Sequence, residues 1–172
     1  MKTAPSLTFE WLDEAHAHGL YEGFSDGQLS RFTPEKPPES LADLRREFAA
    51  FNAGPPPGRS EIWMNWAIRE LGSGLLIGTL QATVFTDGAL WIGYKLVRSA
   101  WGRGIGTAAV HWLLQELAEH CPGKVVRAAV DTRNHASQRV LQKCGFAYVR
   151  SEPAEIRGEA TLDYVYQYRL PE

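Results

Sequence analysis

The segment from Leu90 to Glu116 constrains the fold more than any other stretch of the chain. It begins with an apolar run, Leu90 to Val97, that predicts a β-strand. A glycine-rich turn follows at 101–107, and apolar residues then recur at helical spacing: Ala109, Val110, Leu113, Leu114 and Leu117. A helix that opens directly after a glycine turn presents unpaired N–H groups and a positive dipole end. This arrangement predicts a site for an anion such as a phosphate.

Two common phosphate-binding motifs do not match this turn. A P-loop requires a Lys after its last glycine, and none follows Gly106. A dinucleotide fingerprint belongs to the first strand of a βαβ unit and has a longer spacing before its third glycine. Here roughly half of the chain precedes the turn.

A third pattern does match. The run Arg103-Gly104-Ile105-Gly106-Thr107 resembles the Q/R-x-x-G-x-G/A signature of the GNAT N-acetyltransferases, with Trp101 at the usual Gln/Arg position. The aromatic-Gly-basic-Gly order is similar to the RimJ/RimL-like branch. The resemblance implies that the loop amides hold the pyrophosphate of acetyl-CoA, which serves as co-substrate.

A second stretch carries the same resemblance more specifically. Val125 to Val130 is a strand candidate, and the residues from Asn134 to Phe146 are similar to the branch's N-x-x-S-x-x-V-L-x-K-x-G-F segment. Together the two motifs cover roughly residues 75–149. The terminal strands extend the match over most of the chain.

The remaining pattern predicts the order β-α-α-β-β-β-α-β-α-β-β in a single GNAT acetyltransferase domain, residues 1–172. The class is α+β, with a mixed, mostly antiparallel sheet flanked by helices. Strands are expected at 7–12, 62–69, 75–85, 89–97, 124–131, 146–150 and 161–170, and helices at 13–21, 40–51, 104–120 and 136–143. Residues 151–160 are expected to be charged and flexible, and residues 52–58 to form a loop near the substrate entrance.

The crossover helix after the glycine turn makes the strands at Leu96 and Val126 parallel. Ligands bind beyond the carboxyl ends of such strands. In the family these two strands splay apart, and the resemblance implies that pantetheine lies in the gap.

Composition excludes several classes. The net charge of −2 and the absence of a basic cluster argue against nucleic-acid binding. No apolar run approaches the roughly 20 residues of a membrane span, and no signal peptide is evident, so we expect a cytoplasmic protein without membrane contact. Cys121 and Cys144 lack metal-ligand spacing, and His16 and His18 do not share a helix face. No metal is expected, and both cysteines are predicted to be free thiols.

The resemblance implies a set of cofactor-binding residues: Leu96, Val97, Arg98, Arg103, Gly104, Ile105, Gly106, Thr107, Asn134, Ser137 and Lys143. Asn134 would reach the pantetheine arm, although its pattern fits a helix cap equally well. Ser137 is the catalytic candidate, because in the branch it faces the sulfur of CoA. Many other GNATs place a Tyr where this chain has Leu141.

The sequence does not identify the general base. Family members often carry Glu at the position of Trp91. The carboxylates considered instead are Glu61, Asp87, Glu155 and Glu159, and a water chain to solvent is the default. Trp91 and Tyr94 are candidates for lining the acceptor channel or for packing in the core.

These observations predict an N-acetyltransferase that moves acetyl from acetyl-CoA to a primary amine by direct attack in a ternary complex. The acceptor is a protein N-terminus or a small molecule, and a homodimer is left open. Two alternatives remain: a CoA-binding sensor or scaffold of the same fold without catalysis, and a nucleotide or phosphosugar binder that uses the glycine turn alone.

Overall fold

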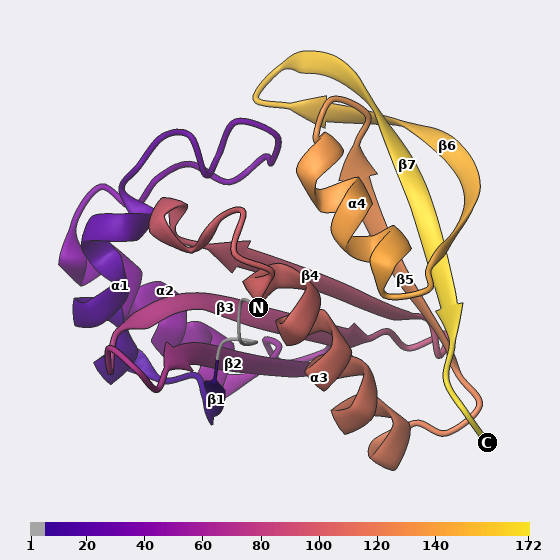
Figure 1. Ribbon diagram of the computed structural model, residues 1–172, viewed down its shortest axis with the longest axis horizontal. Coiled ribbons are helices and arrows are strands. Elements are labelled where there is room, and N and C mark those ends of the chain that lie inside the picture. Colours follow the sequence, from indigo (N-terminus) through magenta and orange to yellow (C-terminus); the bar gives the residue numbers. More distant parts are fainter. Residues whose placement is uncertain (1–5) are drawn as a thin grey trace.

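The computed structural model describes residues 6–172 and contains one seven-stranded sheet with helices on both faces (Figure 1). The strands are β1 (Leu7–Trp11), β2 (Ile62–Glu70), β3 (Leu76–Val84), β4 (Leu90–Leu96), β5 (Val125–Asp131), β6 (Ala147–Ile156) and β7 (Glu159–Arg169). The helices are α1 (Ala17–Phe24), α2 (Leu41–Ala53), α3 (Ile105–His120) and α4 (His135–Lys143), with short 3₁₀ turns at Glu14–His16 and Arg98–Ala100. The predicted order of helices and strands is confirmed.

The sheet has the strand order β1-β2-β3-β4-β5-β7-β6, and only β4 and β5 run parallel within the described part of the chain. Their ladder consists of Leu90 with Val126 and Trp91 with Arg127. Beyond these pairs the two strands diverge, as the ribbon shows (Figure 1). The predicted parallel pair is therefore present, and a gap opens toward the carboxyl ends of β4 and β5.

Two tryptophans of β2 show that α2 and α3 cover opposite faces of the sheet. Trp66 meets Trp112 of α3 edge-on, with ring centroids 5.5 Å apart. Trp63, an odd number of positions away, meets Phe51 of α2 with centroids 6.3 Å apart. Because successive side chains of a strand point to opposite faces, α3 lies on one face and α2 on the other.

The helix ends follow the predicted chemistry. The side chain of Asp13 accepts a hydrogen bond from Ala15 N at the start of the first 3₁₀ turn, and Ser40 Oγ accepts one from Asp43 N at the start of α2. Gly145, with φ of 85°, follows the C-cap of α4. Across residues 6–172, no helix combines the length and apolar character that a bilayer crossing requires.

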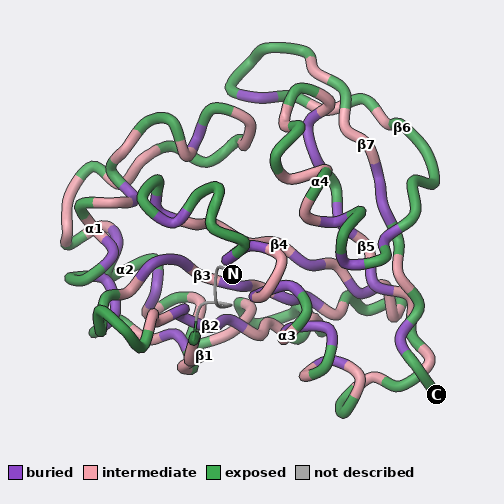
Figure 2. The backbone as a smooth tube through the Cα atoms, in the orientation of Figure 1, coloured by how far each residue is buried: buried purple, intermediate pink, exposed green. Residues whose placement is uncertain are grey.

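The expectation for residues 151–160 is wrong. β6 continues to Ile156 and pairs with β7 as far as Glu159, so this segment is a two-stranded hairpin. Its charged residues lie on an edge strand that is exposed along most of its length, as Figure 2 shows. With little apolar burial, the segment lacks the alternation that identifies a strand, and pairing with β7 supplies the missing stabilisation.

Candidate active site

The glycine turn before α3 leaves open space beside its backbone, since a Cβ at Gly102 would meet nothing within 4 Å. Gly102 and Gly104 have φ of 67° and 78°, a region that residues with a Cβ rarely adopt. A Cβ at Gly104 would meet nothing within 4 Å. The first backbone bond of the helix runs from Ala108 N to Gly104 O, so the amides of Ile105, Gly106 and Thr107 have no backbone partner in the described chain. This geometry can bind an anion at the helix N-terminus.

The first turn of α3 packs directly against α4. A Cβ at Gly106 would lie 3.2 Å from Val140 Cγ2, so Val140 would have to shift to accommodate even an alanine there. Cys144 Sγ donates to Thr107 O at 3.5 Å. The two helices that follow the diverging strands are thereby joined, so the glycine turn and the α4 segment border one gap.

Trp101 braces the turn. Its indole nitrogen donates to Leu96 O at 2.9 Å, at the end of β4. The residue that departs from the family signature therefore closes the loop between β4 and α3.

The predicted basic residues are engaged with carboxylates at the surface. Arg103 bonds to Glu70, and Arg98 lies 3.9 Å from Asp26. Both arginines are exposed, and so is Lys143 at the end of α4. Their contribution to phosphate binding stays a prediction.

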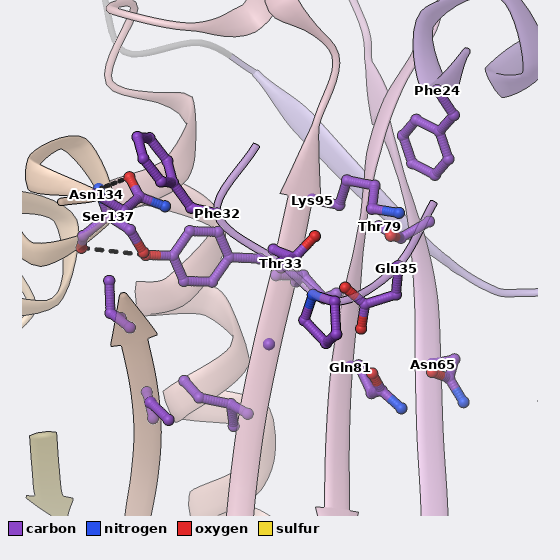
Figure 3. A pocket seen from close by; sticks show the side chains of 18 of the residues that line it. Phe24, Phe32, Thr33, Glu35, Asn65, Thr79, Gln81, Lys95, Asn134 and Ser137 are labelled. Carbon is purple, nitrogen blue, oxygen red and sulfur yellow. Dashed lines mark hydrogen bonds between the residues drawn. The ribbon is translucent and has the colours of Figure 1, made fainter. Parts of the chain in front are cut away.

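Asn134 caps α4, as one of its two interpretations predicted. Its Oδ1 accepts from Ser137 N at 3.2 Å. The amide nitrogen points away from this bond, and Asn134 also lines the cavity described below (Figure 3). Capping is established, while a contact with the pantetheine arm stays a prediction.

Tyr94 reaches across the gap to Ser137. Its hydroxyl lies 2.7 Å from Ser137 Oγ and 3.2 Å from Ser137 O. Burial raises the pKa of Tyr94 to about 12, so the phenol keeps its proton over the whole physiological range. The sequence identified both residues but not their contact, because they are 43 positions apart.

A cavity of about 320 Å³ adjoins this pair. Its floor carries polar side chains of β2 to β4, which Figure 3 shows projecting toward the same space: Asn65, Thr79, Gln81 and Lys95. Three phenylalanines of α1 and α2 line its wall: Phe24, Phe48 and Phe51. The segment Phe32–Glu35 lines it as well. Residues 52–58, expected near the entrance, are not among the lining residues, because the preceding loop takes that place.

The cavity lining carries more negative than positive charge. Its charged residues are Glu35, Glu47, Lys95, Asp131 and Asp163. Arg133 binds Asp131, with Nη2 and Oδ2 2.9 Å apart, and these bonds lower the pKa of that carboxyl. The other three carboxylates face only Lys95 among the lining residues, so the cavity suits a cationic group.

Glu47 is the carboxylate that the sequence analysis missed. Its side chain is exposed, yet the surrounding protein desolvates the carboxyl group and raises its pKa, with Lys95 opposing this shift. A signal was present: Leu44, Glu47 and Phe51 share one helix face, so Glu47 is a charge within an apolar stripe.

The four base candidates named from the sequence lie outside the lining. Glu61 accepts from Trp63 Nε1, Asp87 from Ala89 N in a hairpin turn, and Glu159 from Arg133. Glu155 is on the exposed hairpin of β6 and β7. Asp87, Glu155 and Glu159 are exposed, whereas the Glu61 side chain is largely buried and lies 3.7 Å from Arg59.

The side chains of Trp91 and Tyr94 point to opposite faces of β4, because the two residues are an odd number of positions apart on the strand. Tyr94 lines the cavity and Trp91 does not.

Cys144 is buried, and burial raises its thiol pKa to about 11. Such a thiol is a poor nucleophile near neutral pH. Within residues 6–172 no group of three metal-ligating side chains comes together.

A family model of the Acetyltransferase (GNAT) domain matches residues 6–147, which is most of the chain. The protein belongs to the GNAT acetyltransferase family. It is accordingly an acyl-CoA-dependent N-acetyltransferase that uses acetyl-CoA as co-substrate. A search of curated proteins finds no match.

Solved GNAT structures share the fold over nearly their whole length. An acetyltransferase from Bacillus anthracis is 17% identical with a TM-score of 0.83, and the match covers 99% of this chain and 98% of that one. The acetyltransferase from Salmonella typhimurium that modifies the N-terminal serine of ribosomal protein L7/L12 is 18% identical, with a TM-score of 0.81 and 95% of each chain covered. Spermidine N-acetyltransferase from Vibrio cholerae is 14% identical, with a TM-score of 0.78 and 95% of each chain covered. These neighbours share the GNAT fold, and membership of the RimJ/RimL-like branch stays a prediction.

Proposed function

We propose that this GNAT protein acetylates a primary amine that enters the cavity as a cation, by direct attack in a ternary complex. The observation that carries the proposal is the position of the Tyr94–Ser137 pair. Ser137 and Asn134 belong both to the start of α4, beside the gap between β4 and β5, and to the lining of the cavity. An acetyl donor held along the gap and an acceptor held in the cavity would meet at these residues.

Backbone groups at the start of α3 support the proposed binding of acetyl-CoA, the acetyl donor. The free amides of Ile105, Gly106 and Thr107 would bind the pyrophosphate, and the open space at Gly104 lets it approach. Bound acetyl-CoA supplies an acetyl thioester. Leu96 and Val97, at the end of β4, would contact the pantetheine arm from one side of the gap and Asn134 from the other.

The acceptor side is supported by charge. An ammonium group is attracted by Glu35 and Glu47, whose combined charge exceeds that of Lys95. The amine must lose a proton before it attacks. Because the pKa of Glu47 is raised, this carboxylate is a better proton acceptor than a fully solvated glutamate, and we assign it the role of base, acting directly or through water.

Tyr94 and Ser137 serve the leaving group. Tyr94 keeps its proton. In the proposed arrangement its hydroxyl donates to Ser137 Oγ, which would direct the serine proton toward the departing sulfur. A hydrogen bond to a charge that develops in the transition state lowers the barrier. The proposed roles are thus a positioning role for Tyr94 and a catalytic role for Ser137.

A catalytically inactive CoA-binding sensor was the alternative because a carboxylate is missing at Trp91. Glu47 and Glu35 in the cavity remove that argument. Cytoplasmic location and homodimer formation stay predictions.

The test is thiol release from acetyl-CoA with a panel of amines: peptides with different N-termini, polyamines, aminoglycosides and amino acids. We expect turnover with at least one cationic amine and competition by other cations of similar size. Tight CoA binding without turnover on any amine would instead support the sensor.

A further inference from the structure

The tip of the β6–β7 hairpin has a strained residue. Arg157 and Gly158 form a two-residue turn with φ of 49° and 88°. Such turns favour Asn or Gly at the first position, because a side chain there crowds the backbone. Arg157 is the only residue other than glycine with positive φ in the described chain. A residue held in a strained conformation is a candidate for a specific contact that another residue would not make.

The guanidinium group of Arg157 binds one segment far away in sequence. Nη1 lies 2.9 Å from Ser30 O, 2.9 Å from Thr33 O and 3.3 Å from Glu35 O. Three carbonyls thus converge on one charged nitrogen, and charged hydrogen bonds are stronger than neutral ones. In Figure 1 the hairpin tip and the loop before α2 approach each other above the sheet.

The segment that Arg157 binds is a wall of the acceptor cavity. Residues Phe32 to Glu35 line that cavity. The neighbouring backbone bonds are local ones, from Leu29 N to Asp26 O and from Arg31 N to Gln28 O. Arg157 therefore supplies the hydrogen bonds that tie this loop to the C-terminal hairpin.

A second contact supports the same position. The guanidinium of Arg133 lies over the Phe32 ring, 5.8 Å from its centroid, and Arg133 also bonds to Glu159 beside the hairpin turn. Thr33 Oγ1 is buried without a hydrogen-bond partner among the described residues. A polar acceptor molecule in the cavity would satisfy it.

We propose that Arg157 is a positioning residue that holds residues 30–35 closed over the acceptor cavity and so restricts the acceptor to compact amines. It acts through the loop and touches no reacting atom. The effect on acceptors rests on the proposed function. The bonds from Arg157 to residues 30–35, called the latch below, can be tested without catalysis.

The test uses Arg157→Asn in the full chain. Asn-Gly is the preferred sequence of this turn, so the hairpin should keep its stability while the latch is lost. We expect the Michaelis constant for a compact amine to rise about tenfold, the size of one lost net interaction, with kcat changed less than about twofold. The ratio of kcat/KM for a bulky amine to kcat/KM for a compact amine should rise. The matched control is Arg150→Asn on β6, because Arg150 bonds to Glu152 and not to the loop.

Limited trypsin digestion gives a readout that needs no activity. Arg31 is exposed and lies in the latched segment. We expect cleavage after Arg31 to be roughly fivefold or more faster in Arg157→Asn, and unchanged in Arg150→Asn. Faster cleavage in a protein that acetylates no amine would overturn the proposed function and keep the latch. Unchanged cleavage and an unchanged Michaelis constant, or a fall in kcat alone, would overturn the latch.

Discussion

Tyr94 Oη lies 2.7 Å from Ser137 Oγ, and the two residues come from opposite sides of the gap between β4 and β5. Both residues also line the cavity beside this gap. It gives the serine a fixed partner that does not titrate below alkaline pH, since the pKa of Tyr94 is about 12.

The first prediction concerns this pair. Tyr94→Phe and Ser137→Ala should each lower kcat about tenfold, the effect of one hydrogen bond of roughly 1.4 kcal/mol. Because the two residues act together, the double variant should lose little more than either single one. Steady-state kinetics measure this, with Tyr168→Phe, which packs on Phe146 instead, as the control. Fully multiplicative losses would show that the residues act independently.

Gly104 tests the anion site. Gly104→Glu should abolish stabilisation by millimolar CoA, because it places a carboxylate where we propose that the pyrophosphate binds. Saturation at 100 times the dissociation constant stabilises a protein by about 2.7 kcal/mol, a shift of a few degrees in Tm. Gly104→Ala is the control: it has the backbone strain of φ 78° and a Cβ that meets no protein atom within 4 Å, but it adds no carboxylate. A wild-type CoA shift in Gly104→Glu would place the phosphates elsewhere.

Asn134 caps α4, and we predict that it also contacts the bound cofactor. Asn134→Ala should cost about 1 kcal/mol of unfolding free energy by removing the cap on Ser137 N, and should also weaken CoA binding. Asn134→Asp caps equally well but cannot donate an amide hydrogen bond. Chemical denaturation and CoA titration on both variants separate the effects. Wild-type affinity in Asn134→Asp would leave the residue as a cap alone.

Glu47→Gln should lower kcat/KM for a cationic acceptor by roughly ten- to hundredfold near neutral pH. The loss should shrink as pH approaches the acceptor's own pKa, because a free amine needs no base. Glu61→Gln, outside the cavity lining, should leave the pH profile unchanged. If Glu47→Gln follows the wild-type profile at every pH, proton loss occurs through solvent.

Cys144 gives a prediction for alkaline stability. Its folded pKa of about 11 exceeds the ordinary value of 9.0, so the folded state disfavours the thiolate. The stability that depends on this thiol is complete below pH 9.0 and is lost as pH rises toward about 11. Cys144→Ala should therefore lose less stability than wild type between pH 8 and 11, measured by urea unfolding. The variant should keep its activity, because no acyl-cysteine is formed.

The sequence by itself determined the features that depend on neighbouring residues. The glycine turn, the caps at Ser40 and Asn134 and the stop at Gly145 each follow from local backbone sterics and hydrogen bonding within a few positions. The order of strands and helices follows from periodicity in the same way.

The tertiary structure alone decided which distant side chains meet. Tyr94 and Ser137 are separated by 43 positions, and Arg157 and Ser30 by 127. Glu47 shares a cavity with Lys95 only because the loop and α2 cover the polar face of the sheet. Such contacts depend on strand register and on the path of loops, which long-range packing sets. No local pattern encodes which distant residues meet, so only the folded chain places the proposed base, Glu47, beside Lys95 and places Arg157 against residues 30–35.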